Sequence, residues 1–295
     1  MTILYQVPLR GAGGEPISFA ATVYSHGLAQ LPPASVQNHP LVYRRRLRVR
    51  RRVVEVAINE KKGNLVAQTP VALGSRDSMT IEASIARMFR LHDDLSPFYA
   101  RIAGDALLGW AAHGAGRILA SPSVFEDVIK TICTTNCAWS ATIRMTNALV
   151  ALGEGAFPEP ALLAEAPESW YRETARMGYR GAYVRAIACD VASQALDLES
   201  LLGLDRYADA EVEEMLLALP GIGPYGAAHV MQLLGRHRPL VLDSWTRPKY
   251  LRLTGKKRAA DSTIRRAFAR YGNYAGLAFW LFLTRDWLSR EDGHA

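Results

Sequence analysis

The sequence of 295 residues contains few cysteines and no long apolar run, and both absences narrow the class of protein. Cys133, Cys137 and Cys189 are the only cysteines, and so small and odd a number argues against a disulfide framework. No run of about 18 apolar residues could span a membrane, and the N-terminus lacks the charged and apolar segments of a signal peptide. We therefore expect an intracellular protein that does not bind a membrane.

Metal-binding patterns are also missing. The histidines show no spacing typical of metal ligands or of a catalytic pair, and Cys133 and Cys137 have no further ligands beside them. No cysteine follows Cys189, which excludes an iron–sulfur cluster held by C-terminal cysteines. We expect no metal site and assign Cys133 and Cys137 to the core.

Positive charge, in contrast, is in excess. The sequence has 35 lysines and arginines against 28 acidic residues, a net charge of +7, and its pI is about 9.4. This balance favours a polyanionic partner, because phosphate contacts release condensed counterions. Residues 44–52 include seven arginines. That run suits either an exposed edge strand kept soluble by its charge or an additional surface for phosphates.

The sequence pattern changes near residue 78. Before it, β-like segments at residues 17–24, 41–58 and 64–73 alternate with turn residues. After it, apolar residues recur at helical spacing, and Ser123 with Glu126 forms a capping-box pattern that starts a helix. We predict an α+β fold, with a β-rich N-terminal domain over residues 1–78 and a mainly α-helical domain over residues 79–295.

The most informative segment is a glycine hairpin between two predicted helices. Gly221, Ile222 and Gly223 form it, and Pro224 suits the first turn of the helix that follows. The glycines let a phosphate approach the backbone, and the free N–H groups and dipole at a helix start attract an anion. The same pattern also fits an ordinary corner between helices, so the hairpin favours DNA binding without establishing it.

Asp243 follows this hairpin at the end of an apolar run and before another predicted helix. Aspartate is a favoured N-cap, and a capping carboxylate can leave one oxygen facing a cleft. Breaking an N-glycosidic bond develops positive charge on the sugar, which a nearby carboxylate stabilises. Asp243 is therefore the predicted catalytic residue.

Together, these features make residues 80–290 resemble the helix-hairpin-helix (HhH-GPD) DNA glycosylase superfamily. The resemblance is to the branch of oxoguanine glycosylases and 3-methyladenine glycosylase II. Residues 132–136 are similar to the segment with the family's wedge residue, here Asn136. Residues 177–183 are similar to a Gly-Tyr-Arg segment, which places Tyr179 and Arg180 at the DNA, and residues 271–276 to a Tyr-Ala-Gly segment. The β-rich N-terminus is similar in layout to the accessory domain of this branch.

Departures from the family pattern refine what the resemblance implies. Tyr225 stands where bifunctional relatives carry the lysine that attacks the sugar, which implies a monofunctional enzyme that uses water. We interpret Lys249 as a phosphate contact. Phe279 stands where oxoguanine glycosylases have a base-reading glutamine, which favours a stacking pocket for an alkylated base. The candidates for this pocket, each of which could instead belong to the core, are Trp139, Tyr225, Trp245, Phe279 and Trp280.

The resemblance thus implies a monofunctional DNA N-glycosylase of base excision repair, a monomer that acts on double-stranded DNA containing a damaged base. It needs no redox cofactor or catalytic metal, although the hairpin carbonyls could hold a monovalent cation. The residues expected to bind DNA are Gly221, Ile222, Gly223, Tyr225, Asn136, Tyr179 and Arg180. Two alternatives stay open. One is a bifunctional 8-oxoguanine glycosylase/AP lyase, against which Tyr225 and Phe279 argue, and the other is a non-catalytic DNA-binding protein, against which Asp243 argues.

Overall fold

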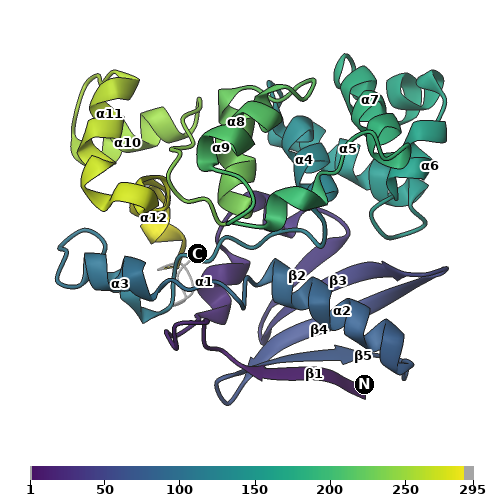
Figure 1. Cartoon of the computed structure of the whole chain (residues 1–295), viewed down its shortest axis with the longest axis horizontal. Helices are drawn as coiled ribbons and strands as arrows, with labels where there is room; N and C mark the ends of the chain where they lie inside the picture. The colour runs from purple at the N-terminus through teal and green to yellow at the C-terminus, as the bar shows by residue number, and fades with distance from the viewer. Residues whose placement is uncertain (1, 289–295) are drawn as a thin grey trace.

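The computed structural model describes residues 2–288 and consists of one antiparallel sheet beside a larger group of helices (Figure 1). In this part of the chain the strand order is β1-β5-β4-β3-β2. The strands are β1 (Thr2–Pro8), β2 (Ala34–Asn38), β3 (Leu41–Val49), β4 (Arg52–Lys61) and β5 (Asn64–Thr69). The helices are α1 (Phe19–Val23), α2 (Ser75–Met88), α3 (Ser96–Ile102), α4 (Val124–Thr134), α5 (Trp139–Leu152), α6 (Pro160–Glu165), α7 (Arg180–Ala192), α8 (Asp209–Leu217), α9 (Pro224–Leu233), α10 (Thr246–Thr254), α11 (Asp261–Phe268) and α12 (Ala275–Leu288). The predicted α+β class is confirmed.

Helix α2 covers one face of the sheet (Figure 1). Alternate residues of β3, among them Tyr43 and Leu47, are buried in one cluster with Ile81 and Ile85 of α2. The boundary expected at residue 78 falls inside α2, and residues of α2 after it, such as Ile81 and Ile85, belong to the core of the sheet.

One local prediction about the β-rich region is wrong, and another is right about β structure but joins two strands into one segment. Residues 17–24 contain the helix α1, because the Ser18 hydroxyl caps it by accepting the N–H of Ala21 and its apolar residues pack in the sheet's core. Residues 41–58 form two strands, because the chain reverses at Arg50, whose φ is 54°. Strand β1 was not predicted.

The arginine run is not an exposed edge strand. It lies mainly on β3, which pairs with β2 and β4 on its two sides. Arg45 faces the core of the sheet and is 2% exposed, and it forms an ion pair with Glu126 of α4. Lys130 Nζ lies 2.7 Å from the other oxygen of the Glu126 carboxylate. Four further arginines of the run also form ion pairs, namely Arg46, Arg48, Arg50 and Arg52.

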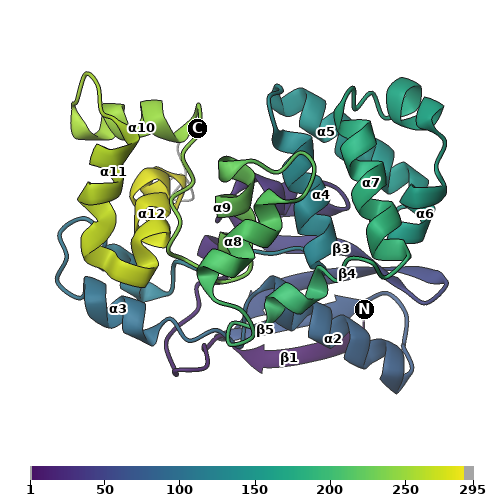
Figure 2. The same ribbon diagram turned by 45° about the horizontal axis from the view of Figure 1, so that its top comes forward.

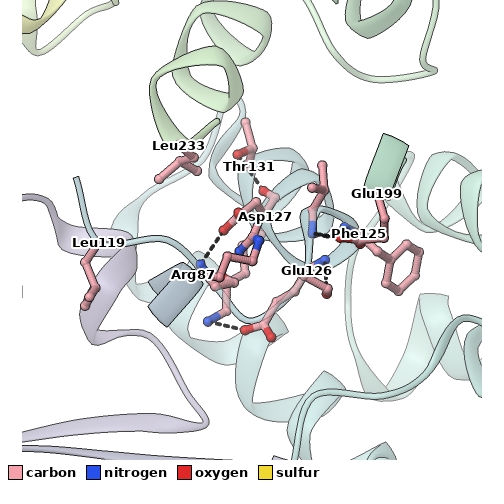
Figure 3. A network of polar contacts seen from close by, with 12 residues as sticks. Arg87, Leu119, Phe125, Glu126, Asp127, Thr131, Glu199 and Leu233 are labelled. Atoms are coloured by element: carbon pink, nitrogen blue, oxygen red, sulfur yellow. Dashed lines mark hydrogen bonds and ion pairs between the residues drawn. The ribbon is translucent and has the colours of Figure 1, made fainter. Parts of the chain in front are cut away.

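Polar contacts hold the N-terminal half of helix α4 against its neighbours (Figure 3). The Ser123 hydroxyl accepts the N–H of Glu126, as predicted, and the Glu199 carboxylate accepts the N–H groups of Val124 and Phe125. One turn further, Arg87 of α2 donates to Asp127 at 2.9 Å. Helix α4 is therefore held between the sheet and the other helices. Its position also determines where Thr135 and Asn136, which follow its C-terminus, lie.

The helical part has two hydrophobic clusters that meet at α9. One gathers residues of α4, α5, α7 and α8, and the other gathers residues of α3, α10, α11 and α12. Ala227 and Val230 of α9 belong to the first cluster, whereas Ala228 and Leu233 belong to the second. Figure 2 shows α9, next to α8, with α10, α11 and α12 on one side and α4, α5, α6 and α7 on the other.

Candidate active site

A cleft of about 650 Å³ opens where the two helical groups meet, a size typical of ligand sites. It brings together the hairpin, Asp243, Asn136, Tyr179 and Tyr225, which lie far apart in the sequence. The cleft is lined by Thr134, Thr135, Asn136, Cys137, Tyr179, Tyr183, Gly221, Ile222, Gly223, Pro224, Tyr225, Gly226, Leu242, Asp243, Ser244 and Arg247.

The hairpin joins α8 to α9 at one side of the cleft. Gly221 has a φ of 84°, and a Cβ there would lie 2.6 Å from the ring of Tyr183. Gly223 is exposed, and a Cβ there would meet nothing within 4 Å. Within residues 2–288, the backbone N–H groups of Gly221 and Gly223 donate to no protein oxygen. They are available to a phosphate at the start of α9, where the helix dipole also favours an anion.

Substitutions of the two glycines should separate folding from binding. Gly221→Ala is expected to weaken binding of damaged and undamaged duplexes and to lower stability by about 1–3 kcal/mol, because of its left-handed backbone. Gly223→Ala is expected to keep stability and to weaken binding, because its methyl group would occupy the approach of a phosphate. Urea unfolding and duplex titrations measure the two effects. Unchanged affinity in both variants would show that the hairpin only connects two helices and does not bind DNA.

Asp243 makes the capping contacts expected for it and lies in the cleft lining. Its Oδ1 accepts the N–H groups of Trp245 at 2.8 Å and Thr246 at 2.6 Å, and its own N–H donates to the Thr246 hydroxyl at 2.8 Å. These bonds cap the first turn of α10 and fix the carboxylate. Asp243 is partly exposed and lines the cleft, and its Oδ2 accepts no hydrogen bond from the described residues.

Asn136 and Tyr179 lie together in the cleft lining. Asn136 has a φ of 46°, and its Nδ2 lies 3.4 Å from the Tyr179 hydroxyl. Arg180, which the sequence predicted at the DNA, is buried: it is 7% exposed, and its Nε donates to the carbonyl of Thr135 at 3.0 Å. Its guanidinium also lies over the ring of Tyr179. The guanidinium of Arg180 therefore contacts Thr135 and Tyr179 inside the protein and helps to position them.

Tyr225 lies in the first turn of α9, two residues after Gly223. Its hydroxyl is 3.3 Å from the Thr134 hydroxyl, and its ring is nearly parallel to that of His229, with centroids 6.1 Å apart. Burial raises the pKa of Tyr225 above its ordinary value of 10.0, so the phenol stays neutral at physiological pH. The ring therefore offers the cleft an uncharged aromatic surface.

Three buried histidines, one of them His229 against this ring, should make the protein sensitive to acid. Burial lowers the pKa of His26 to about 4, of His229 to about 3 and of His237 to about 4, against 6.5 for the free side chain. Below pH 6.5 the unfolded chain binds protons that the folded chain does not bind, so stability should fall as pH decreases toward 4. The loss is at most about 1.4 kcal/mol per histidine for each pH unit. Urea unfolding at pH 7 and pH 4.5 measures it: His229→Leu should reduce the difference, and the exposed His92→Gln should leave it unchanged.

Four of the five aromatic residues proposed for the base pocket do not line the cleft. Phe279 is fully buried against Phe268 and Tyr250, and Trp280 donates its indole N–H to the Ser25 carbonyl. Trp139 packs against Gly27, and Trp245 lies beside Trp280 and Trp287 with the rings tilted; Trp139 and Trp245 are 45% and 40% exposed. Only Tyr225 lines it. Helical spacing marked these rings as apolar, but tertiary packing decided which of them face the core.

The structure also changes the interpretation of Lys249 and Cys137. Lys249 is 6% exposed and lies 2.6 Å from Asp286, so it is not a phosphate contact. Cys133 is buried as predicted, whereas Cys137 is half-buried and lines the cleft.

Sequence reasoning missed several side chains of the cleft, among them Tyr183 and Arg247. Tyr183 lies one helical turn after Tyr179, and Arg247 one turn after Asp243, so helical spacing from the predicted residues could have found both. Arg247 donates two hydrogen bonds to Asp261 at 2.8 and 2.9 Å.

Metal ligands and membrane-spanning helices are both absent from residues 2–288. No three His, Cys, Asp or Glu side chains in this range are grouped as a metal site requires. None of its helices combines the length and the apolar character needed to cross a membrane.

Comparison with solved structures assigns the fold. The chain shares the fold of solved 3-methyladenine and 8-oxoguanine DNA glycosylases, with the β-rich region included, as the resemblance in the sequence implied. A 3-methyladenine DNA glycosylase from Archaeoglobus fulgidus matches with a TM-score of 0.71 and 21% identity, over 96% of this chain and 99% of that one. An 8-oxoguanine glycosylase/lyase from Clostridium acetobutylicum, in its apo form, matches with a TM-score of 0.69 and 20% identity, over 92% and 94%. A Schizosaccharomyces pombe 3-methyladenine DNA glycosylase in complex with abasic DNA matches with a TM-score of 0.51 and 17% identity, over 72% and 100%. No protein-family model and no curated protein matches the sequence.

Proposed function

We propose that this protein is a DNA glycosylase that hydrolyses the N-glycosidic bond of a damaged nucleotide flipped out of a duplex. The observation that carries the proposal is one cleft with three features: the hairpin with free N–H groups, the half-free carboxylate of Asp243, and Asn136. The fold adds support, because the matching structures are described as DNA glycosylases and one of them holds abasic DNA.

In the proposed reaction each of these residues has one step. The N–H groups of Gly221 and Gly223 hold a backbone phosphate, and Asn136 fills the gap left by the flipped nucleotide. As the bond between C1′ and the base breaks, Asp243 Oδ2 stabilises the positive charge on the sugar. The base leaves with the electron pair of the broken bond. A water oxygen then bonds to C1′ and loses its proton to Asp243 Oδ2, from which it passes to solvent, and an abasic site and a free base remain. Since Oδ1 is fixed by two N–H groups, the carboxylate needs no reorganisation during the reaction.

An alkylated base is the substrate class that the cleft supports best. Alkylated purines carry positive charge, which is attracted to the face of an uncharged aromatic ring. Tyr225 offers such a ring, and Tyr179 and Tyr183 also line the cleft. This proposal replaces the larger aromatic pocket expected from the sequence.

Duplexes that each carry one defined lesion test the function. After incubation with the protein, alkali cleaves the DNA wherever a base has been released. We expect strand cleavage with alkylated purines and little with 8-oxoguanine. Release from no lesion, with intact duplex binding, would instead favour a non-catalytic DNA-binding protein.

The cleft also supports a monofunctional enzyme. A lyase attacks the sugar with an amine, but none of the described residues that line the cleft is a lysine. Lys249, the lysine nearest to Asp243 in the sequence, is buried against Asp286.

Borohydride trapping should therefore give no covalent protein–DNA adduct, and strands should stay intact until alkali is added. Tyr225→Lys, which places an amine in the cleft, is expected to gain weak trapping, and Tyr225→Phe serves as the matched control. Strong trapping by the unmodified protein would contradict the monofunctional assignment.

A further inference from the structure

The excess positive charge of the chain is concentrated in one segment. Residues 246–270 contain nine lysines and arginines and one acid, Asp261, which gives a net charge of +8. The whole chain carries +7, so the remaining residues together are close to neutral. This segment comprises α10, α11 and the loop between them.

Most of these cations have no acidic partner. Among residues 2–288, Arg247, Lys249 and Arg270 of this segment form ion pairs. The other six are exposed and form no ion pair with any described residue. We call these six the basic segment: Arg252, Lys256, Lys257, Arg258, Arg265 and Arg266.

The basic segment begins close to the cleft. Helix α10 starts three residues after Asp243, and its nine residues extend about 14 Å. Gly255, with a φ of 68°, then ends the helix and turns the chain into the loop with Lys256, Lys257 and Arg258. Asp261, the first residue of α11, forms an ion pair with Arg247, which lines the cleft. The start of α11 therefore lies next to the cleft.

The opposite flank of the hairpin has the opposite charge. Residues 205–214, in and before α8, contain five acids and one arginine. Figure 2 shows α10 and α11 on one side of the α8–α9 pair. Phosphates held at the hairpin are therefore repelled on the α8 side and attracted on the α10–α11 side.

We propose that the basic segment is a second DNA-binding surface, which holds the phosphate backbone of the duplex beyond the nucleotide at the hairpin. A distance of about 14 Å corresponds to about four base pairs, so several phosphates lie within its reach. The surface recognises charge and not sequence, because lysine and arginine contacts to phosphate carry no base information. This proposal rests on the proposed DNA partner and not on the proposed chemistry.

The test compares two triple variants with the same change in charge. One is Lys256→Gln/Lys257→Gln/Arg258→Gln, and the control is Lys61→Gln/Lys62→Gln/Arg76→Gln, on exposed positions of β4, the β4–β5 turn and α2. Affinity for an undamaged duplex is measured over a range of salt concentrations. In the first variant the slope of log affinity against log salt should decrease by about 0.9 for each lost contact, and affinity at about 0.1 M salt should fall about tenfold or more. The control should keep both.

Equal losses in the two variants would overturn the proposal, because net charge alone would then explain the binding. An unchanged slope in the first variant would overturn it as well. So would a first variant that binds DNA normally but no longer binds anionic phospholipid vesicles, because the basic segment would then be a membrane-binding surface. Base release by the unmodified protein is assayed separately. A failure of the glycosylase proposal is therefore distinguishable, because it leaves the difference in slope in place.

Discussion

Asp243→Asn is expected to abolish base release, with a loss of at least about 10²–10³ in rate. The variant keeps an oxygen that can cap α10, so the fold should be retained, but it loses the negative charge that stabilises the sugar cation. Affinity for duplex DNA should stay the same or increase, because a negative charge near the phosphates disappears. Single-turnover base release and duplex titration measure the two effects.

Asp261→Asn is the matched control, since it removes a carboxylate near the same cleft that pairs with Arg247 and has no assigned catalytic role. It should keep most of the base release. Near-normal turnover by Asp243→Asn would contradict the catalytic assignment. Loss of its circular dichroism signal would show that Asp243 is required mainly as a cap.

Glu126→Gln is expected to lower stability by about 3–5 kcal/mol. Glu126 lies between Arg45 and Lys130, and all three side chains are almost fully buried. Without its charge, two cations would remain buried beside each other, and burial already lowers the pKa of Lys130 to about 8. Urea unfolding at pH 7 measures the loss of stability. The contact between the sheet and α4 should be weakened, because Glu126 joins the two.

Lys130→Met separates charge balance from the mere loss of contacts. The Arg45–Glu126 ion pair that remains has no net charge. Lys130→Met should therefore lower stability much less than Glu126→Gln, because replacing a buried charge by an apolar group is often tolerated. Equal losses in the two variants would show that the charges do not determine the stability of this contact.

The sequence by itself determined the local features of the site. The glycines of the hairpin, Pro224 at the start of α9 and Asp243 before α10 depend on backbone geometry and capping, which neighbouring residues dictate. The change from β-like to helical periodicity likewise predicted the α+β class. For this reason the hairpin and the catalytic candidate could be named from the sequence alone.

Only the tertiary structure decided which side chains face the cleft and which are buried. Phe279 and Lys249 have the residue types expected of a DNA enzyme, yet they pack in the core and against Asp286. Arg45 belongs to a run that looks like a solvated strand, but Glu126, 81 residues away, neutralises it inside the protein. Burial and ion pairing depend on contacts between distant segments, and a periodic pattern defines a face of an element without saying what covers that face.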